Sequence, residues 1–156
     1  MDQAQSLTAP QALEELRGCY DAFIQKLEKS QASSVGEVMG RFFRSQGNPR
    51  VAYAVEEFDA ALTQQVATLA GLLADCPAEE AGELAAQALE LMLFYPIPAD
   101  NNIAFSLAAF EGRAQPLVAF LPPPRRQEAA RRYAKRTPPR RMLPNQQKLW
   151  KQLSLL

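Results

Sequence analysis

Apolar residues recur at steps of three and four along most of the first 95 residues, which is the spacing of one face of an α-helix. The first such stripe lies between about residues 10 and 29, and it consists of Leu13, Leu16, Tyr20, Phe23, Ile24 and Leu27. Thr8 and Gln11 stand three residues apart, as in a capping box, where each side chain bonds the backbone N–H of the other residue. These two residues therefore predict where the first helix begins.

Three further helices are predicted before residue 96. One begins near Ser34 and ends near Gly47. The next begins at Asn48-Pro49, because asparagine caps a helix and proline tolerates its first position. Its stripe runs for more than six turns through Val51, Val55, Phe58, Leu62, Val66, Leu69 and Leu73. The fourth covers roughly residues 78–94, between the prolines at 77 and 96.

Residues 100–121 fit two structures. Asp100, Asn101 and Asn102 are good helix caps, and Gly112 would close a helix that ends at Glu111. Alternation of apolar residues over 103–107 would instead suit a strand, paired with residues 116–121 in a hairpin. The helix is favoured because the caps fit and the turn residues of a two-residue hairpin are missing.

The composition of the chain changes after residue 121, where proline and arginine become frequent. The run Pro122-Pro123-Pro124 predicts a stiff polyproline spacer. A short basic helix is predicted over 125–136, with a break at 137–139. Asn145 would cap a last helix, which carries Leu149, Trp150 and Leu153 on one side.

Together these patterns predict an all-α fold. Residues 1–121 would form an acidic, antiparallel bundle of four to five helices. Residues 122–156 would form an extended, basic, Pro/Arg-rich C-terminal arm that ends in a short amphipathic helix.

The net charge of zero conceals a strong asymmetry. Residues 1–112 contain sixteen acidic and six basic residues, a balance of −10. Residues 113–156 contain eleven basic residues and one acid, Glu128, a balance of +10. This separation of charge predicts different electrostatic partners for the two parts of the chain.

Composition excludes several kinds of site. The chain has no histidine and two cysteines, which excludes a histidine-dependent triad and a zinc site made of imidazole or of four thiolates. Glu56 and Asp59 could share one side of a helix, but a carboxylate metal site needs ligands from other helices as well. We therefore expect no enzyme, no catalytic residue, no metal and no cofactor. The sequence lacks a secretory signal and an apolar run long enough to span a membrane, so a cytoplasmic location without membrane contact is expected.

The basic segment is the sharpest functional signal. Eight cations lie within seventeen residues: Arg125, Arg126, Arg131, Arg132, Lys135, Arg136, Arg140 and Arg141. Arginine favours planar, bidentate contacts with phosphate or carboxylate groups. Tyr133 and Trp150 could stack on a base.

Three interpretations of this segment remain open. It could bind the phosphates of DNA or RNA, dock on an acidic protein, or lie on the acidic body of the same or a neighbouring copy. Our first hypothesis is a small, non-enzymatic accessory protein or complex subunit that contacts nucleic acid through the eight cations. The alternative is an adaptor, chaperone or inhibitor that binds a protein partner or self-associates. Its partner contacts would come from Tyr133, Leu149, Trp150 and Leu153.

Overall fold

The computed structural model describes residues 7–31, 49–97 and 104–154, and every regular element in these ranges is a helix. The elements are α1 (Ala9–Gln31), α3 (Pro49–Ala74), α4 (Ala78–Phe94), α5 (Ala104–Gly112), α6 (Gln115–Val118), α7 (Pro123–Arg136), the 3-10 turn η2 (Pro139–Arg141) and α8 (Pro144–Ser154). The prediction of an all-helical chain is confirmed over this part of the sequence. The helix predicted from Ser34 lies outside the described residues.

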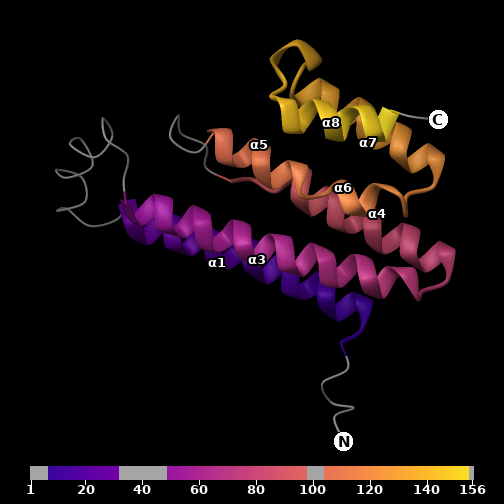
Figure 1. Cartoon of the computed structure of the whole chain (residues 1–156), viewed down its shortest axis with the longest axis horizontal. Helices are drawn as coiled ribbons and strands as arrows, with labels where there is room; N and C mark the ends of the chain where they lie inside the picture. Colours follow the sequence, from indigo (N-terminus) through magenta and orange to yellow (C-terminus); the bar gives the residue numbers. More distant parts are fainter. Residues whose placement is uncertain (1–6, 32–48, 98–103, 155–156) are drawn as a thin grey trace, which may run out of the picture.

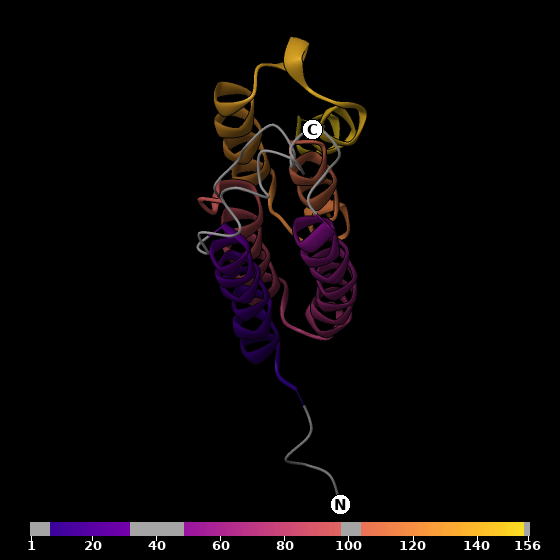
Figure 2. The same ribbon diagram turned by 90° about the vertical axis from the view of Figure 1, so that its left-hand side faces the viewer.

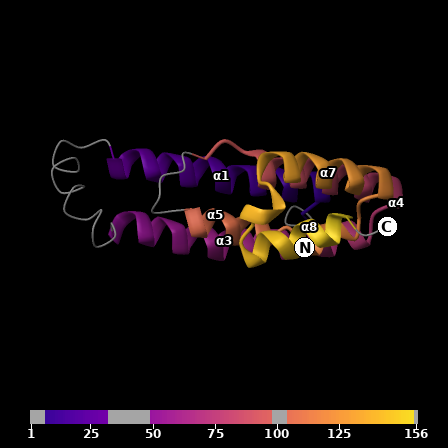
Figure 3. The same ribbon diagram turned by 90° about the horizontal axis from the view of Figure 1, so that it is seen from above.

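The helices form three layers (Figures 1 and 2). α1 and α3 lie side by side in the first layer, α4 with α5 and α6 in the second, and α7 with α8 in the third. Seen from above, α7 and α8 run next to each other as the outermost pair (Figure 3). One apolar core runs through all three layers.

The first helix begins where the capping-box spacing predicted. The backbone N–H of Thr8 donates to the Oε1 of Gln11 over 2.9 Å, and the N–H of Gln11 donates to the Oγ1 of Thr8 over 3.3 Å. Each residue thus satisfies a backbone donor that the first turn of a helix leaves unpaired. The predicted start of α4 after Pro77 is also confirmed, whereas Asn48, the predicted cap of α3, lies outside the described residues.

Aromatic rings join the first two layers. The rings of Phe23 in α1 and Phe58 in α3 stack at a centroid distance of 4.4 Å. The ring of Phe110 in α5 meets Phe58 edge to face at 4.7 Å. Phe110 belongs to α5, and residues 115–118, the expected partner strand of the hairpin, lie in the helix α6. The hairpin alternative is therefore wrong for this segment.

The C-terminal segment is folded onto the body, so the predicted extended arm is not what the structure shows. Its buried apolar residues belong to the same core as those of α1, α3, α4, α5 and α6, and they are Ala130, Tyr133, Met142, Leu149 and Leu153. The start of α7 at Pro123 shows that the prolines do not form a spacer. Pro122 is the N-cap residue, and Pro123 and Pro124 occupy the first turn, where a missing N–H costs no hydrogen bond.

A glycine of α4 allows the turn that leads into α7 to pack closely. Gly82 in α4 faces the turn before α7, where an added Cβ would lie 3.2 Å from the Cδ of Pro122. The lack of a side chain there allows the turn to pack closely.

α8 begins at Pro144, so Asn145 is not its cap. The N–H of Leu143 is bonded instead by the side chain of Gln146, over 2.9 Å.

Candidate functional site

The basic residues of α7 fall into two groups on different sides of the helix. Successive residues on a helix are about 100° apart, so Arg125, Arg132 and Arg136 share one side. We call them the α4-facing arginines, because each reaches across to α4. Arg131 and Lys135 lie on the side opposite the buried Tyr133.

The α4-facing arginines hold carboxylates and a carbonyl of α4. The guanidinium of Arg132 donates two hydrogen bonds to the carboxylate of Glu90, over 2.6 and 3.0 Å. Arg125 donates to Glu83 over 3.1 Å, and Arg136 donates to the backbone carbonyl of Leu93. The interpretation in which the basic segment lies on its own acidic body therefore holds for these three residues.

The pair of Arg132 and Glu90 also changes the acidity of both groups. The hydrogen bond from Arg132 lowers the pKa of Glu90 below its ordinary value, and the same bond raises the pKa of Arg132. The guanidinium of Arg132 also lies 4.2 Å from the ring centre of Phe94, where the negative face of the ring attracts it. Its charge is thus already satisfied within the fold.

Six of the other cations of α7, η2 and α8 face away from the core. All six are exposed, and no ion pair joins any of them to an acid in the described part of the chain: Arg131, Lys135, Arg140, Arg141, Lys148 and Lys151. We call this set the outer basic face. It spans α7, η2 and α8, which form the outermost layer (Figure 3). Arg126 belongs to neither group. Its side chain is partly buried, and its Nε has no hydrogen-bond partner in the part of the chain that the structure describes.

Lys148 and Lys151 were not among the predicted site residues. On α8 they lie on the side opposite Leu149 and Leu153, both of which are buried. Their spacing of three residues beside an apolar stripe would have placed them on the free side of this helix. They were overlooked because the density of cations is lower there than over residues 125–141.

The residues predicted to contact a protein partner serve the core instead. Tyr133, Leu149 and Leu153 each have 0% of their surface exposed. Trp150 is half-buried and packs against the core. In this conformation, only part of the Trp150 side chain is available to another molecule.

A polar network fixes α7 and α8 to α5. The hydroxyl of Tyr133 donates to the Oε1 of Glu111 over 2.6 Å, and the Nε2 of Gln146 donates to the same oxygen over 2.9 Å. Burial, and then the charge of Glu111, raises the pKa of Tyr133. One carboxylate thus joins three helices, which orients the outer basic face.

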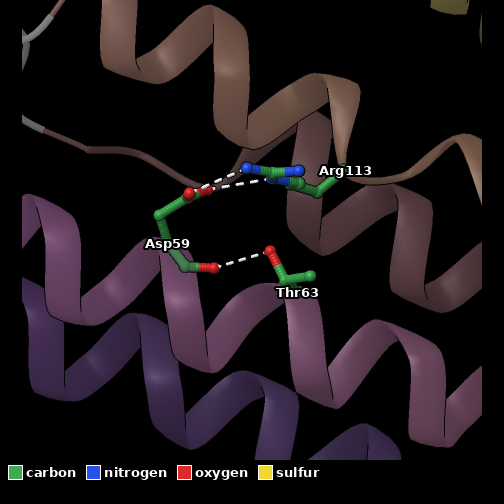
Figure 4. Close-up of polar contacts among 3 residues, drawn as sticks. All are labelled: Asp59, Thr63 and Arg113. Atoms are coloured by element: carbon green, nitrogen blue, oxygen red, sulfur yellow. Dashed lines mark hydrogen bonds and ion pairs between the residues drawn. The ribbon is translucent and has the colours of Figure 1, made fainter.

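Asp59, one of the two carboxylates considered for a metal site, links two layers of the fold. Asp59 in α3 receives two hydrogen bonds from the guanidinium of Arg113, over 3.0 and 2.8 Å (Figure 4). Its backbone carbonyl accepts a third from the hydroxyl of Thr63, over 2.8 Å. No group of three or more possible metal ligands occurs among residues 7–31, 49–97 and 104–154. Asp59 is therefore a structural link between the first two layers.

Two shallow grooves border α4. One, of about 250 Å³, lies between α4 and α7, and the other, of about 400 Å³, lies between α4 and α1. Both are lined by Glu90 and Arg125, which already bond other residues. Neither groove therefore offers a charged pair free to act on a ligand.

Within the described ranges, no helix is both long and apolar enough to cross a membrane. Comparison with known proteins adds no further constraint, since no family model, curated protein or solved structure matches the chain.

Proposed function

We propose that this protein is a small, non-enzymatic accessory subunit that binds the phosphate backbone of nucleic acid through its outer basic face. One observation carries the proposal. Six exposed cations share the outermost layer without an ion-pair partner among the described residues, whereas Arg125 and Arg132 in the same layer are paired with acids. Cations that the fold leaves unpaired are available to an external polyanion.

The rigidity of the layer supports this proposal. Tyr133, Leu149 and Leu153 anchor α7 and α8 in the core, and the bonds to Glu111 fix the two helices relative to α5. The four cations of α7 and α8 are therefore carried by helices whose positions are set before binding. Preorganisation of this kind reduces the entropy lost when a charged partner binds.

The distribution of charge supports it as well. Residues 123–154 contain ten basic residues and one acid, while the other acids on the described helices all belong to α1, α3, α4 and α5 in the other two layers. A polyanion would be attracted to the third layer and repelled by the first. This asymmetry would orient the protein on its partner.

The proposal assigns no reaction to the chain. The adaptor alternative would use the same outer basic face on an acidic protein surface. It is less favoured because three of its four expected contact residues are fully buried. The two functions differ in what binds, so a nucleic-acid binding assay separates them.

The proposal is tested by measuring the fluorescence anisotropy of labelled oligonucleotides against the full chain across a salt series. The informative variant is Arg131→Gln with Lys135→Gln, which removes two exposed cations. The matched control is Arg17→Gln with Lys29→Gln, because both residues are exposed on α1 in the opposite layer and carry the same charge.

Removing Arg131 and Lys135 should reduce the slope of log K against log salt by about two units, since each phosphate contact contributes about 0.9. The control pair should leave the slope unchanged. Equal losses in both variants would show that binding follows net charge alone, and the proposal would be wrong.

A further inference from the structure

We infer that the outer basic face takes double-stranded nucleic acid and contacts its backbone without reading the base sequence. The inference rests on the proposed function, and it specifies the class of nucleic acid. It follows from the lack of an exposed aromatic platform on the face, from the width of the layer formed by α7 and α8, and from the charge density of a duplex.

Binding of single strands generally depends on aromatic side chains on which the bases stack. The two aromatic residues of the C-terminal segment do not provide such a platform, because Tyr133 is fully buried and Trp150 packs against the core. Among the described residues, the only large hydrophobic side chain that is exposed is Tyr53, at 68%. Tyr53 belongs to α3, in the layer opposite the outer basic face. A single strand would therefore gain electrostatic contacts there but no stacking.

Reading the sequence of a duplex requires an element that enters a groove. A helix with its side chains is about 10–12 Å wide, so the paired helices α7 and α8 form a layer about 20 Å wide. The major groove of B-DNA is only about 12 Å wide. Both helices also keep one side in the core, through Tyr133 on α7 and Leu149 on α8. Because the two helices are fixed in the core side by side, we expect the whole layer to rest across the groove on the phosphates that border it.

The charge density of the phosphate backbone then favours a duplex over a single strand. A DNA duplex carries one negative charge per about 1.7 Å of its axis, about twice the density of one of its strands. A fixed array of cations meets more phosphates on the duplex. The release of counterions per contact is also larger there, with slopes of about −0.9 per contact against −0.7 for single strands.

The test compares four probes with the full chain: two 20-base-pair DNA duplexes of unrelated sequence, one of their single strands, and an RNA duplex. We expect the duplexes to bind about tenfold more tightly than the single strand at 50 mM salt, with the steeper salt dependence. The two DNA duplexes should agree within about twofold, because backbone contacts carry no sequence information. Similar affinity for the RNA duplex would show that the shared phosphate backbone is the target, whereas a strong DNA preference would limit the class to B-form duplexes.

Other outcomes separate the inference from the function on which it rests. If the single strand bound as tightly as the duplexes, or if the two sequences differed by more than about tenfold, the inference would be wrong while the proposed function stood. If no probe bound at 50 mM salt, the proposed function itself would be wrong.

The variant Tyr53→Ala provides a control for stacking. This side chain is exposed, so its loss leaves the fold intact. Binding of every probe should be unchanged. A selective loss of single-strand binding in this variant would overturn the inference, since it would locate a stacking site in the opposite layer.

Discussion

The guanidinium of Arg132 is held by the carboxylate of Glu90 and lies over the ring of Phe94, so one side chain of α7 contacts two residues of α4. This contact divides the basic helix into an internally paired side and a free side. Both side chains remain about half-exposed to solvent, which limits the energy of the pair. A double-mutant cycle with Glu90→Gln and Arg132→Gln should therefore give a coupling of about 0.5–1 kcal/mol that falls with added salt. Chemical denaturation at two salt concentrations measures it, and a coupling above about 2 kcal/mol would contradict this description.

The same pair should make stability depend on acid pH. The hydrogen bond from Arg132 lowers the pKa of Glu90 in the folded state below its ordinary value of 4.5. Unfolding therefore favours protonation of Glu90. The ionised Glu90 thus contributes to stability above pH 4.5, and this contribution is lost as the pH falls through the lower pKa that Glu90 has in the folded state. Urea denaturation should show a difference between the native chain and Glu90→Gln at pH 7 that shrinks below pH 4. A constant difference across this range would exclude the ionised pair as its source.

Two buried tyrosines should respond in opposite ways to loss of the hydroxyl. The hydroxyl of Tyr133 bonds Glu111, so Tyr133→Phe should reduce the free energy of unfolding by about 1–2 kcal/mol. The hydroxyl of Tyr20 is buried without a hydrogen-bond partner among the described residues. Tyr20→Phe should therefore be neutral or stabilising by up to about 1 kcal/mol. Thermal and urea denaturation of the two variants provides the comparison, and equal destabilisation would contradict the hydrogen-bond assignments.

Alkaline pH should destabilise the fold through Tyr133. Burial raises the pKa of Tyr133 above its ordinary value of 10.0, because the core disfavours the phenolate. The unfolded state therefore loses this proton first, so the contribution is intact below pH 10 and is lost as the pH rises further. The native chain should lose more stability than Tyr133→Phe between pH 9 and 11. Parallel losses in the two proteins would show that Tyr133 does not titrate on unfolding.

Two glycines should also respond with opposite signs to alanine. A Cβ added at Gly112 would lie 3.1 Å from the Cβ of Asn145, where the end of α5 meets the start of α8. Gly112→Ala should cost about 1–2 kcal/mol, because the helices must shift apart. Gly71 lies within α3 with no atom within 4 Å of an added Cβ, so Gly71→Ala should stabilise the chain by about 0.5–1 kcal/mol. Denaturation curves that moved in the same direction would show that α5 and α8 do not pack this closely.

The local structure was predictable from sequence where short-range chemistry decides it. The capping box of Thr8 and Gln11 and the bounds of α4 follow from spacing and from proline positions, and the structure agrees with both. The choice of a helix over a hairpin after residue 104 also followed from local signals. These features need no knowledge of the neighbouring layers.

The position of the C-terminal segment was not predictable in the same way. A basic, proline-containing sequence is typical of an extended arm, but α7 and α8 bury Tyr133, Leu149 and Leu153 in the common core. The prolines were misleading because Pro123 and Pro124 are accepted in the first turn of a helix. The division of the basic residues into paired and free groups depends on where Glu83 and Glu90 lie, 42 residues earlier in the chain. Tertiary contacts of this kind leave no local signal.

This packing makes deletion of residues 122–156 unsuitable as a test of binding. The shortened chain would expose the side of the core that Tyr133 and Leu149 cover, so we expect it to lose cooperative thermal unfolding. Circular dichroism during heating tests this expectation. A sharp transition in the shortened chain would instead show that the first two layers fold without the third.

The most direct test of the central claim compares free and paired cations on the same helix. The variant Arg131→Gln with Lys135→Gln removes two free cations, whereas Glu90→Gln with Arg132→Gln removes an internal pair without changing the net charge. Salt-dependent binding to a DNA duplex should lose about two units of slope in the first variant and almost none in the second. If the second variant lost as much slope as the first, Arg132 would itself contact phosphate, and the division of α7 into a paired side and a binding side would be wrong.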